Sequence, residues 1–186
     1  MKFGIIAAME EELKTLLMAL QDKEEVIVLG KTYYAGHIGQ HEVVLVQSGI
    51  GKVMSAMSVA ILAETFKVDA IINTGSAGAV SEGLAIGDVV IADRLVYHDV
   101  DVTAFGYAYG QMAGQELYYQ AEQTLVASLQ TVLNQQGIHN HVGLIATGDS
   151  FIAGQEKVDV IKNRFPEVLA VEMEGAAIRS EERRVG

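Results

Sequence analysis

Two groups of carboxylates are the side chains of this sequence best suited to acid–base chemistry. Glutamates occupy residues 10–12, directly after a short apolar run, and Glu172 and Glu174 flank Met173 after another apolar run. Carboxylates beside buried segments are costly unless they are paired or used, so the second group favours a functional site. The first group has a simpler explanation, because the dipole of a helix stabilises acidic residues in its first turn.

Two further segments could bind a ligand. Residues 73–79 read Asn-Thr-Gly-Ser-Ala-Gly-Ala, and such glycines let the backbone approach a ligand closely. Residues 147–152 read Thr-Gly-Asp-Ser-Phe-Ile, in which Phe151 could stack on a flat heterocycle while the backbone of Ile152 bonds to its edge. Taken alone, the first segment is explained at least as well by a tight turn, and the second is explained better by a core phenylalanine.

The elements that must position these residues alternate between strands and helices. Hydrophobic periodicity predicts strands at residues 3–8, 25–29, 32–38, 42–47, 70–73, 88–96, 143–147 and 168–171, and helices at 10–20, 52–66, 120–136 and 155–164. The alternation predicts an α/β fold, a three-layer αβα sandwich. A hairpin turn at Gly39-Gln40 adds antiparallel strands, so the central sheet should be mixed. Each candidate segment follows a strand, where α/β folds place ligands.

Composition narrows the class of protein further. The 186 residues carry a net charge of −11, which disfavours a nucleic-acid partner because phosphate binding needs clustered Lys and Arg. There is no cysteine, so disulfides and thiolate chemistry are absent. The apolar start is too short for a signal peptide, and no apolar stretch is long enough to cross a membrane. We therefore expect a cytoplasmic protein.

Six segments together resemble the 5′-methylthioadenosine/S-adenosylhomocysteine nucleosidase family, within the purine nucleoside phosphorylase-like superfamily. They are Gly-Ile-Ile-Ala-Ala-Met-Glu-Glu-Glu at 4–12, Ser-Gly-Ile-Gly-Lys at 48–52, Ile-Asn-Thr-Gly-Ser-Ala-Gly at 72–78, Asp-Val-Thr-Ala-Phe-Gly-Tyr at 101–107, Gly-Asp-Ser-Phe-Ile at 148–152 and Val-Glu-Met-Glu at 171–174. Their order and spacing make chance agreement implausible, and the resemblance extends over residues 1–178. It implies a nucleoside phosphorylase-like fold.

The resemblance implies hydrolysis of the N-glycosidic bond of 5′-methylthioadenosine and S-adenosylhomocysteine, in methionine salvage. Glu12 would be the general base that activates water, and Glu174 would hold a ribose hydroxyl. The substrate-binding residues would be Met9 and Ile50 near the sugar and thioether, Ser76 and Gly78 on the water and ribose side, Phe151 and Ile152 at adenine, Met173 against the ribose, and Glu172. Val102 and Phe105 would reach the pocket of a neighbouring subunit, which implies a homodimer. The substrate would be a small nucleoside, and no cofactor or metal is implied.

The resemblance also implies a feature that residues 1–178 do not contain. Members of the family carry a further strand, a loop with an Arg and a Ser-Asp pair, and a closing helix, and that aspartate protonates the adenine ring. We expect this chain to be impaired without it, since losing a general acid typically costs about 10²- to 10⁴-fold in rate. Asp149 is the nearest carboxylate to the adenine segment, but the family pattern gives it no role.

The last residues differ in character from the rest of the chain. Residues 179–184 are all polar, so we expect no apolar stripe there and no packing against a core. Residues 179–186 also resemble a translated sequencing adapter, which predicts a nucleosidase domain at 1–178 and a non-native tail at 179–186.

Two other functions compete with the nucleosidase. A purine nucleoside phosphorylase would use phosphate in place of water, but the glutamates at 10–12 would repel a dianion. A non-catalytic nucleoside-binding remnant would keep the pocket without turnover.

Overall fold

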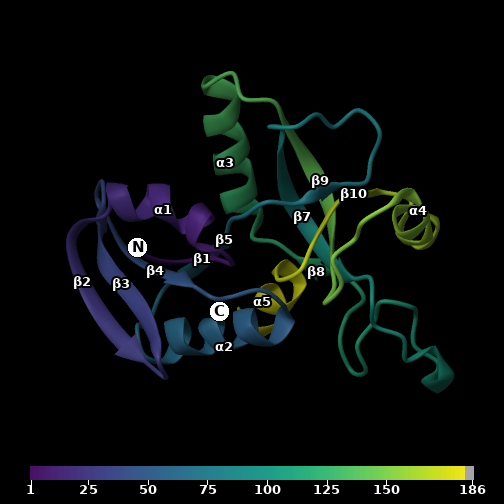
Figure 1. Ribbon diagram of the computed structural model, residues 1–186, viewed down its shortest axis with the longest axis horizontal. Helices are drawn as coiled ribbons and strands as arrows, with labels where there is room; N and C mark the ends of the chain where they lie inside the picture. Colours follow the sequence, from purple (N-terminus) through teal and green to yellow (C-terminus); the bar gives the residue numbers. More distant parts are fainter. Residues whose placement is uncertain (183–186) are drawn as a thin grey trace. The chain divides into compact units, whose positions relative to one another are not determined.

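The computed structural model describes residues 1–182, which form two compact units (Figure 1). The first unit comprises Met1–Ser76 and the chain from Ser180, and the second comprises Ala77–Arg179. The first contains β1 (Lys2–Ala7), α1 (Glu10–Ala19), β2 (Gln21–Val28), β3 (Lys31–Ile38), β4 (His41–Gln47), α2 (Lys52–Glu64) and β5 (Ala70–Asn73). The second contains β6 (Gly78–Ala79), β7 (Val89–Tyr97), η1 (Thr103–Phe105), β8 (Tyr119–Gln120), α3 (Gln123–Gln135), β9 (Asn140–Thr147), α4 (Gln155–Arg164) and β10 (Val168–Glu172). The last helix, α5 (Gly175–Glu182), begins in the second unit and ends in the first.

The sheet of the first unit is mixed, with strand order β2-β3-β4-β1-β5. β1 lies between β4 and β5 and is parallel to both. β2, β3 and β4 are antiparallel neighbours joined by tight turns. In the turn between β2 and β3, Leu29 and Gly30 both have positive φ, which fits the twist of a two-residue hairpin. The carboxyl ends of β4, β1 and β5 therefore lie along one edge of the sheet.

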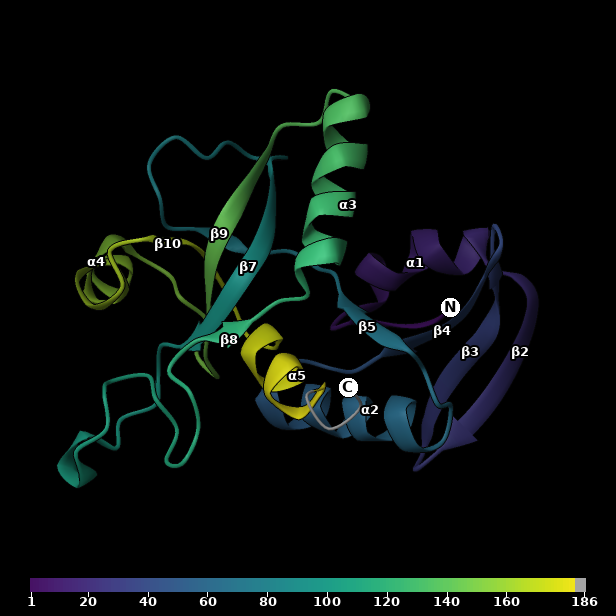
Figure 2. The same cartoon turned by 180° about the vertical axis from the view of Figure 1, so that it is seen from behind.

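Helices cover both faces of this sheet, as Figures 1 and 2 show. Ile5 and Ala7 pack in one cluster with Leu13 of α1. Gly4 points to the other face, where an added Cβ would lie 2.9 Å from a methyl of Leu62 in α2. Successive residues of a strand face opposite sides, so β1 is buried between the two helices. This explains its continuous apolar sequence.

The second unit has its own mixed sheet, with order β6-β10-β9-β7-β8. β9 is parallel to β7 and β10, while the two-residue strands β6 and β8 add antiparallel edges. Val96 and Leu144 pack with Ile161 of α4 on one face. Leu95 and Ile145 pack with the alanines that begin α5 on the other face. The layers again run helix, sheet, helix.

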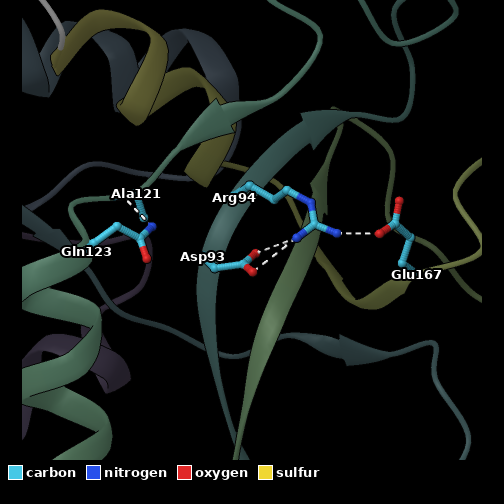
Figure 3. A network of polar contacts seen from close by, with 5 residues as sticks. All are labelled: Asp93, Arg94, Ala121, Gln123 and Glu167. Atoms are coloured by element: carbon cyan, nitrogen blue, oxygen red, sulfur yellow. Dashed lines mark hydrogen bonds and ion pairs between the residues drawn. The ribbon is translucent and has the colours of Figure 1, made fainter.

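A half-buried polar network marks an irregularity in β7 (Figure 3). The register of β7 against β9 shifts between Ala92 and Arg94, and Asp93 lies in that shift. Arg94 donates to both oxygens of Asp93, at 3.0 and 3.2 Å, and also to Glu167, which precedes β10. Such pairs contribute little stability at the surface, about 0–1 kcal/mol. We read this network as structural.

The expected α/β class with three-layer packing and mixed strands is confirmed, although the strands are divided between two sheets. Most boundaries fall within two or three residues of the prediction. The predicted strand at 25–29 begins four residues earlier, at Gln21, where polar residues form an edge strand. The two-residue strands β6 and β8 were not predicted, because pairs so short carry no periodicity.

The expectation for the polar residues after Ile178 is wrong over the part that the structure describes. α5 continues to Glu182, and Ser180 is only 4% exposed. Glu182 accepts a hydrogen bond from the backbone N–H of Ile71 at 3.2 Å. Polar side chains thus pack here by hydrogen bonding, which an apolar pattern does not reveal. The rest of the proposed tail, residues 183–186, lies outside the described residues, and the division at 178 stays a prediction. No helix within residues 1–182 is long and apolar enough to cross a membrane.

Candidate functional site

The carboxylate of Glu12 is held where β1 passes into α1. Its Oε2 accepts hydrogen bonds from the backbone N–H groups of Ala8 at 3.0 Å and Met9 at 3.1 Å. Glu12 is the third residue of α1, so this is the reach-back of a capping box, which satisfies donors at a helix start. Helix capping accounts for the hydrogen bonds that Oε2 accepts, whereas Oε1 takes no part in capping.

The second oxygen of Glu12 binds Ser76, 64 positions along the chain. Oε1 accepts the backbone N–H of Ser76 at 2.8 Å and its hydroxyl at 2.9 Å. Gly75 makes this approach possible, since an added Cβ would lie 2.9 Å from Oε1 and 3.0 Å from Oε2. The glycine-rich segment after β5 is therefore folded against the glutamate that follows β1. A carboxylate has about four lone-pair directions, and four protein donors occupy those of Glu12.

A second carboxylate site lies where β10 passes into α5. Oε2 of Glu172 accepts the backbone N–H groups of Glu174 at 2.9 Å and Gly175 at 2.7 Å. Its Oε1 bonds to the hydroxyl of Thr147 at the end of β9. The same hydroxyl accepts the N–H of Ala176 at 2.9 Å. Glu172 and Thr147 thus satisfy consecutive donors at the start of α5.

Burial changes the ionisation of this site. Desolvation raises the pKa of Glu172, and the nearby charge of Glu174 adds to the rise. Hydrogen bonds from Thr147 and the backbone amides of Glu174 and Gly175 oppose it. The Glu174 side chain is only 8% exposed, and its Oε2 accepts the N–H of Met173 at 3.3 Å. A carboxylate this buried is expensive without a partner or a use.

The predicted adenine segment follows Thr147 in the second unit. Phe151 is 78% exposed, so the structure does not use it as a core residue. Ile152 packs its side chain against the cluster that contains Val80 and Val96. Burial of that side chain fixes the backbone beside an exposed aromatic ring, which is the arrangement that the sequence suggested for a flat heterocycle.

The predicted subunit-contact loop is ordered by its own polar residues. Asp101 accepts the N–H of Thr103 at 3.1 Å and its hydroxyl at 2.7 Å, and these bonds lower the pKa of Asp101. Val102 packs against the core cluster that includes Tyr97 and Val100. Phe105 ends the short helix η1 and is 82% exposed. The loop therefore presents an aromatic ring on a fixed support.

The other predicted residues lie at strand ends in their own units. Ile50 is 57% exposed in the loop between β4 and α2. Lys31 donates to the carbonyl of Ser48 in this loop, and burial lowers the pKa of that lysine. Gly78 lies on β6 and pairs with Val171 of β10.

Neither Thr147 nor Lys31 was assigned a role of its own from the sequence. Thr147 had a usable signal, since it is a polar residue at the end of an apolar run and begins the predicted segment at 147–152. Lys31 had none, because its contact with Ser48 depends on how β3 pairs with β4. Within residues 1–182 no group of three or more His, Cys, Asp or Glu side chains is arranged to hold a metal ion.

Comparison with known proteins decides the family. Residues 2–179 match the Phosphorylase superfamily. A 5′-methylthioadenosine/S-adenosylhomocysteine nucleosidase of Oceanobacillus iheyensis is 48% identical over 178 residues, which cover 96% of this chain and 78% of the relative. The chain belongs to the 5′-methylthioadenosine/S-adenosylhomocysteine nucleosidase family.

Solved structures of nucleosidases agree with this assignment. The S-adenosylhomocysteine nucleosidase of Streptococcus pyogenes superposes with a TM-score of 0.97 at 67% identity, covering 99% of this chain and 78% of that one. The nucleosidase of Streptococcus pneumoniae, solved with a transition-state inhibitor, gives 0.96 at 66% identity, covering 99% and 80%. The nucleosidase fold expected from the sequence is thus confirmed. These comparisons give no support to impaired activity, a non-catalytic remnant or a phosphorylase.

Proposed function

We propose that this chain hydrolyses the N-glycosidic bond of 5′-methylthioadenosine and S-adenosylhomocysteine, which releases adenine and the thioribose product. The observation that carries the proposal is the Glu12 carboxylate, which is held by four hydrogen-bond donors. Two of these donors follow the carboxyl end of β1, and the other two belong to Ser76, which follows β5. An oriented carboxylate is what activation of a water molecule requires. Family membership supplies the reaction that this geometry serves.

Rotation of the Ser76 hydroxyl can free a lone pair of Glu12, which lets Glu12 act as the general base. Because four donors fill the carboxylate, a water can bind only if one donor leaves. Three of the donors are backbone N–H groups, whose positions are fixed, whereas the Ser76 hydroxyl can rotate. On substrate binding the hydroxyl turns toward the water, and the freed lone pair of Glu12 accepts a proton from that water as the water oxygen bonds to the ribose carbon. The bond from that carbon to adenine breaks, and the leaving adenine takes up a proton from solvent.

Glu174 binds a hydroxyl of the ribose in this proposal. Hydrolysis builds positive charge on the ribose, and a carboxylate bonded to a ribose hydroxyl stabilises that charge more in the transition state than in the ground state. The burial of Glu174 supports this role, since its field is less screened than that of a surface carboxylate. Met173 and Ile50 would contact the sugar and thioether, and Gly78 would leave room beside the ribose.

Phe151 and Ile152 bind adenine, by ring stacking and by backbone hydrogen bonds respectively. We further infer a cytoplasmic homodimer in which Phe105 and Val102 reach the partner's pocket. The exposed ring of Phe105 on an ordered loop supports this arrangement. Sedimentation should give a dimer, and Phe105→Ala should raise KM for methylthioadenosine. A monomer with full activity would contradict the dimer.

The test of the function is adenine release from methylthioadenosine by the purified chain. We expect equal amounts of adenine and methylthioribose, with no requirement for phosphate. Glu12→Gln and Glu174→Gln should each abolish turnover, whereas Glu11→Gln, an exposed neighbour of Glu12, is the matched control. Formation of a ribose-1-phosphate product would instead establish a phosphorylase, and adenine binding without turnover would establish a binding remnant.

A further inference from the structure

The start of α5 is fixed by two side chains that belong to strands. The N–H groups of Glu174 and Gly175 donate to Glu172, and that of Ala176 donates to Thr147. These groups are among the donors that a helix start leaves without a partner inside the helix. Thr147 and Glu172 are themselves bonded to each other. The location of Glu174 at the start of α5 therefore depends on this pair. Figure 1 shows α5 and the strands β9 and β10 that carry the two residues.

The pair is anchored in the sheet. Thr147 and Glu172 are register partners at the carboxyl ends of the parallel strands β9 and β10. The N–H of Gly148 donates to the carbonyl of Glu172 at 3.2 Å, which closes the two strand ends together. Thr147 is fully buried. The backbone of both residues is therefore held by the sheet, so their side chains connect the strand ends to the start of α5.

Most of the hydrogen-bonding capacity of Glu172 is already used by the protein. Oε2 accepts two N–H groups and Oε1 binds the Thr147 hydroxyl, so three of the about four lone-pair directions of this carboxylate are occupied. The three donors belong to the end of β9 and the start of α5. This favours a structural use of the Glu172 carboxylate.

We propose that Thr147 and Glu172 form one positioning unit, which holds the first turn of α5 and thereby aims the Glu174 carboxylate at the ribose, without either residue contacting the substrate. The inference rests on the proposed nucleosidase function. It reassigns Glu172 from substrate binding to positioning, and it gives Thr147 a role that the sequence did not suggest.

Thr147→Val is the decisive variant, because valine keeps the shape and removes the hydroxyl. We expect kcat for methylthioadenosine to fall by up to about 100-fold while KM changes much less, since a small misplacement of a transition-state contact acts on kcat. Thr147→Ser, which keeps the hydroxyl, should restore most of the rate. Thr131→Val is the matched control, because that exposed hydroxyl bonds only to Ala127 within α3.

Glu172 is tested by graded substitutions. Glutamine can accept the two N–H groups with its oxygen and donate to the Thr147 hydroxyl with its amide, so Glu172→Gln should lose less activity than Glu172→Ala. The effects of Thr147→Val and Glu172→Ala should not add in the double variant, because residues of one network are coupled. Thermal unfolding of each variant shows whether it is folded.

A second measurement does not depend on turnover. In the substrate-free chain, Thr147→Val should speed hydrogen exchange at the Ala176 amide, and the Thr131 control should not. Wild-type kcat in a folded Thr147→Val chain, together with inactive Glu172→Gln, would overturn the proposal and return Glu172 to the substrate. Unchanged exchange at Ala176 would also overturn it. Failure of the nucleosidase assignment would appear separately, as absence of adenine release by the wild-type chain with the exchange result intact.

Discussion

Ser76 donates two hydrogen bonds to one oxygen of Glu12, from its backbone N–H at 2.8 Å and from its hydroxyl at 2.9 Å. The two residues follow adjacent parallel strands, β1 and β5, so the sheet brings together side chains that are far apart in sequence. The contact converts a helix-capping glutamate into a carboxylate with a fixed direction. Its consequences for catalysis are open to direct test.

Ser76→Ala should lower kcat by up to about tenfold, because the hydroxyl no longer holds the attacking water and an ordinary hydrogen bond is worth about 0.5–1.5 kcal/mol. The backbone N–H of Ser76 remains, so the variant should fold normally. Steady-state kinetics and thermal unfolding of the purified chain check both statements. An unchanged kcat would mean that the hydroxyl does not direct the base.

Gly75→Ala should damage activity much more than stability. The added Cβ would lie 2.9 Å from Oε1 of Glu12, so the carboxylate must move and give up part of its hydrogen bonding to the helix start and Ser76. Its displacement should reduce kcat by about 10- to 100-fold, since misplaced catalytic groups are costly. Measuring kcat and the free energy of unfolding of the same variant shows whether activity falls more than stability. A parallel loss of both would point to a structural role alone.

Phe151→Ala should leave stability almost unchanged, because the side chain is 78% exposed. Stacking of a base on an aromatic ring is worth about 1–3 kcal/mol, so adenine should bind about 5- to 150-fold more weakly. Calorimetry with adenine measures this directly. Phe151→Tyr, which keeps the ring, is the control, and equal binding by Ala and Tyr variants would remove Phe151 from the adenine site.

Glu172→Gln should become increasingly more stable than the wild type as pH rises. Burial raises the pKa of Glu172 in the folded chain above its unfolded value of about 4.3. The folded state then binds more protons in that window, so wild-type stability falls as pH rises through the folded pKa. Glutamine does not titrate. Urea unfolding of both chains from pH 4 upward should show the difference growing and then levelling off, and a difference that shrinks would refute this sign.

Local patterns predicted much of the fold. The apolar run that became β1 and the apolar spacing in α1 are properties of neighbouring residues, and the structure places both elements within two residues of the predicted bounds. Local sequence patterns did not predict structure that depends on contacts with residues far away in the sequence. Gly78 and Ala79 form a strand only because β10 lies beside them, and Ser180 is buried although its neighbours are polar.

The sequence by itself determined the family of this protein, since the spacing of its motifs is a property of the chain and needs no coordinates. Through the resemblance to that family it also predicted roles for Glu12 and Glu174. Only the tertiary structure decided how those carboxylates are held. Ser76 meets Glu12 because β1 and β5 pair in register, and Thr147 meets Glu172 because β9 and β10 do. Hydrogen bonds between side chains depend on distance in space, which sequence separation does not encode.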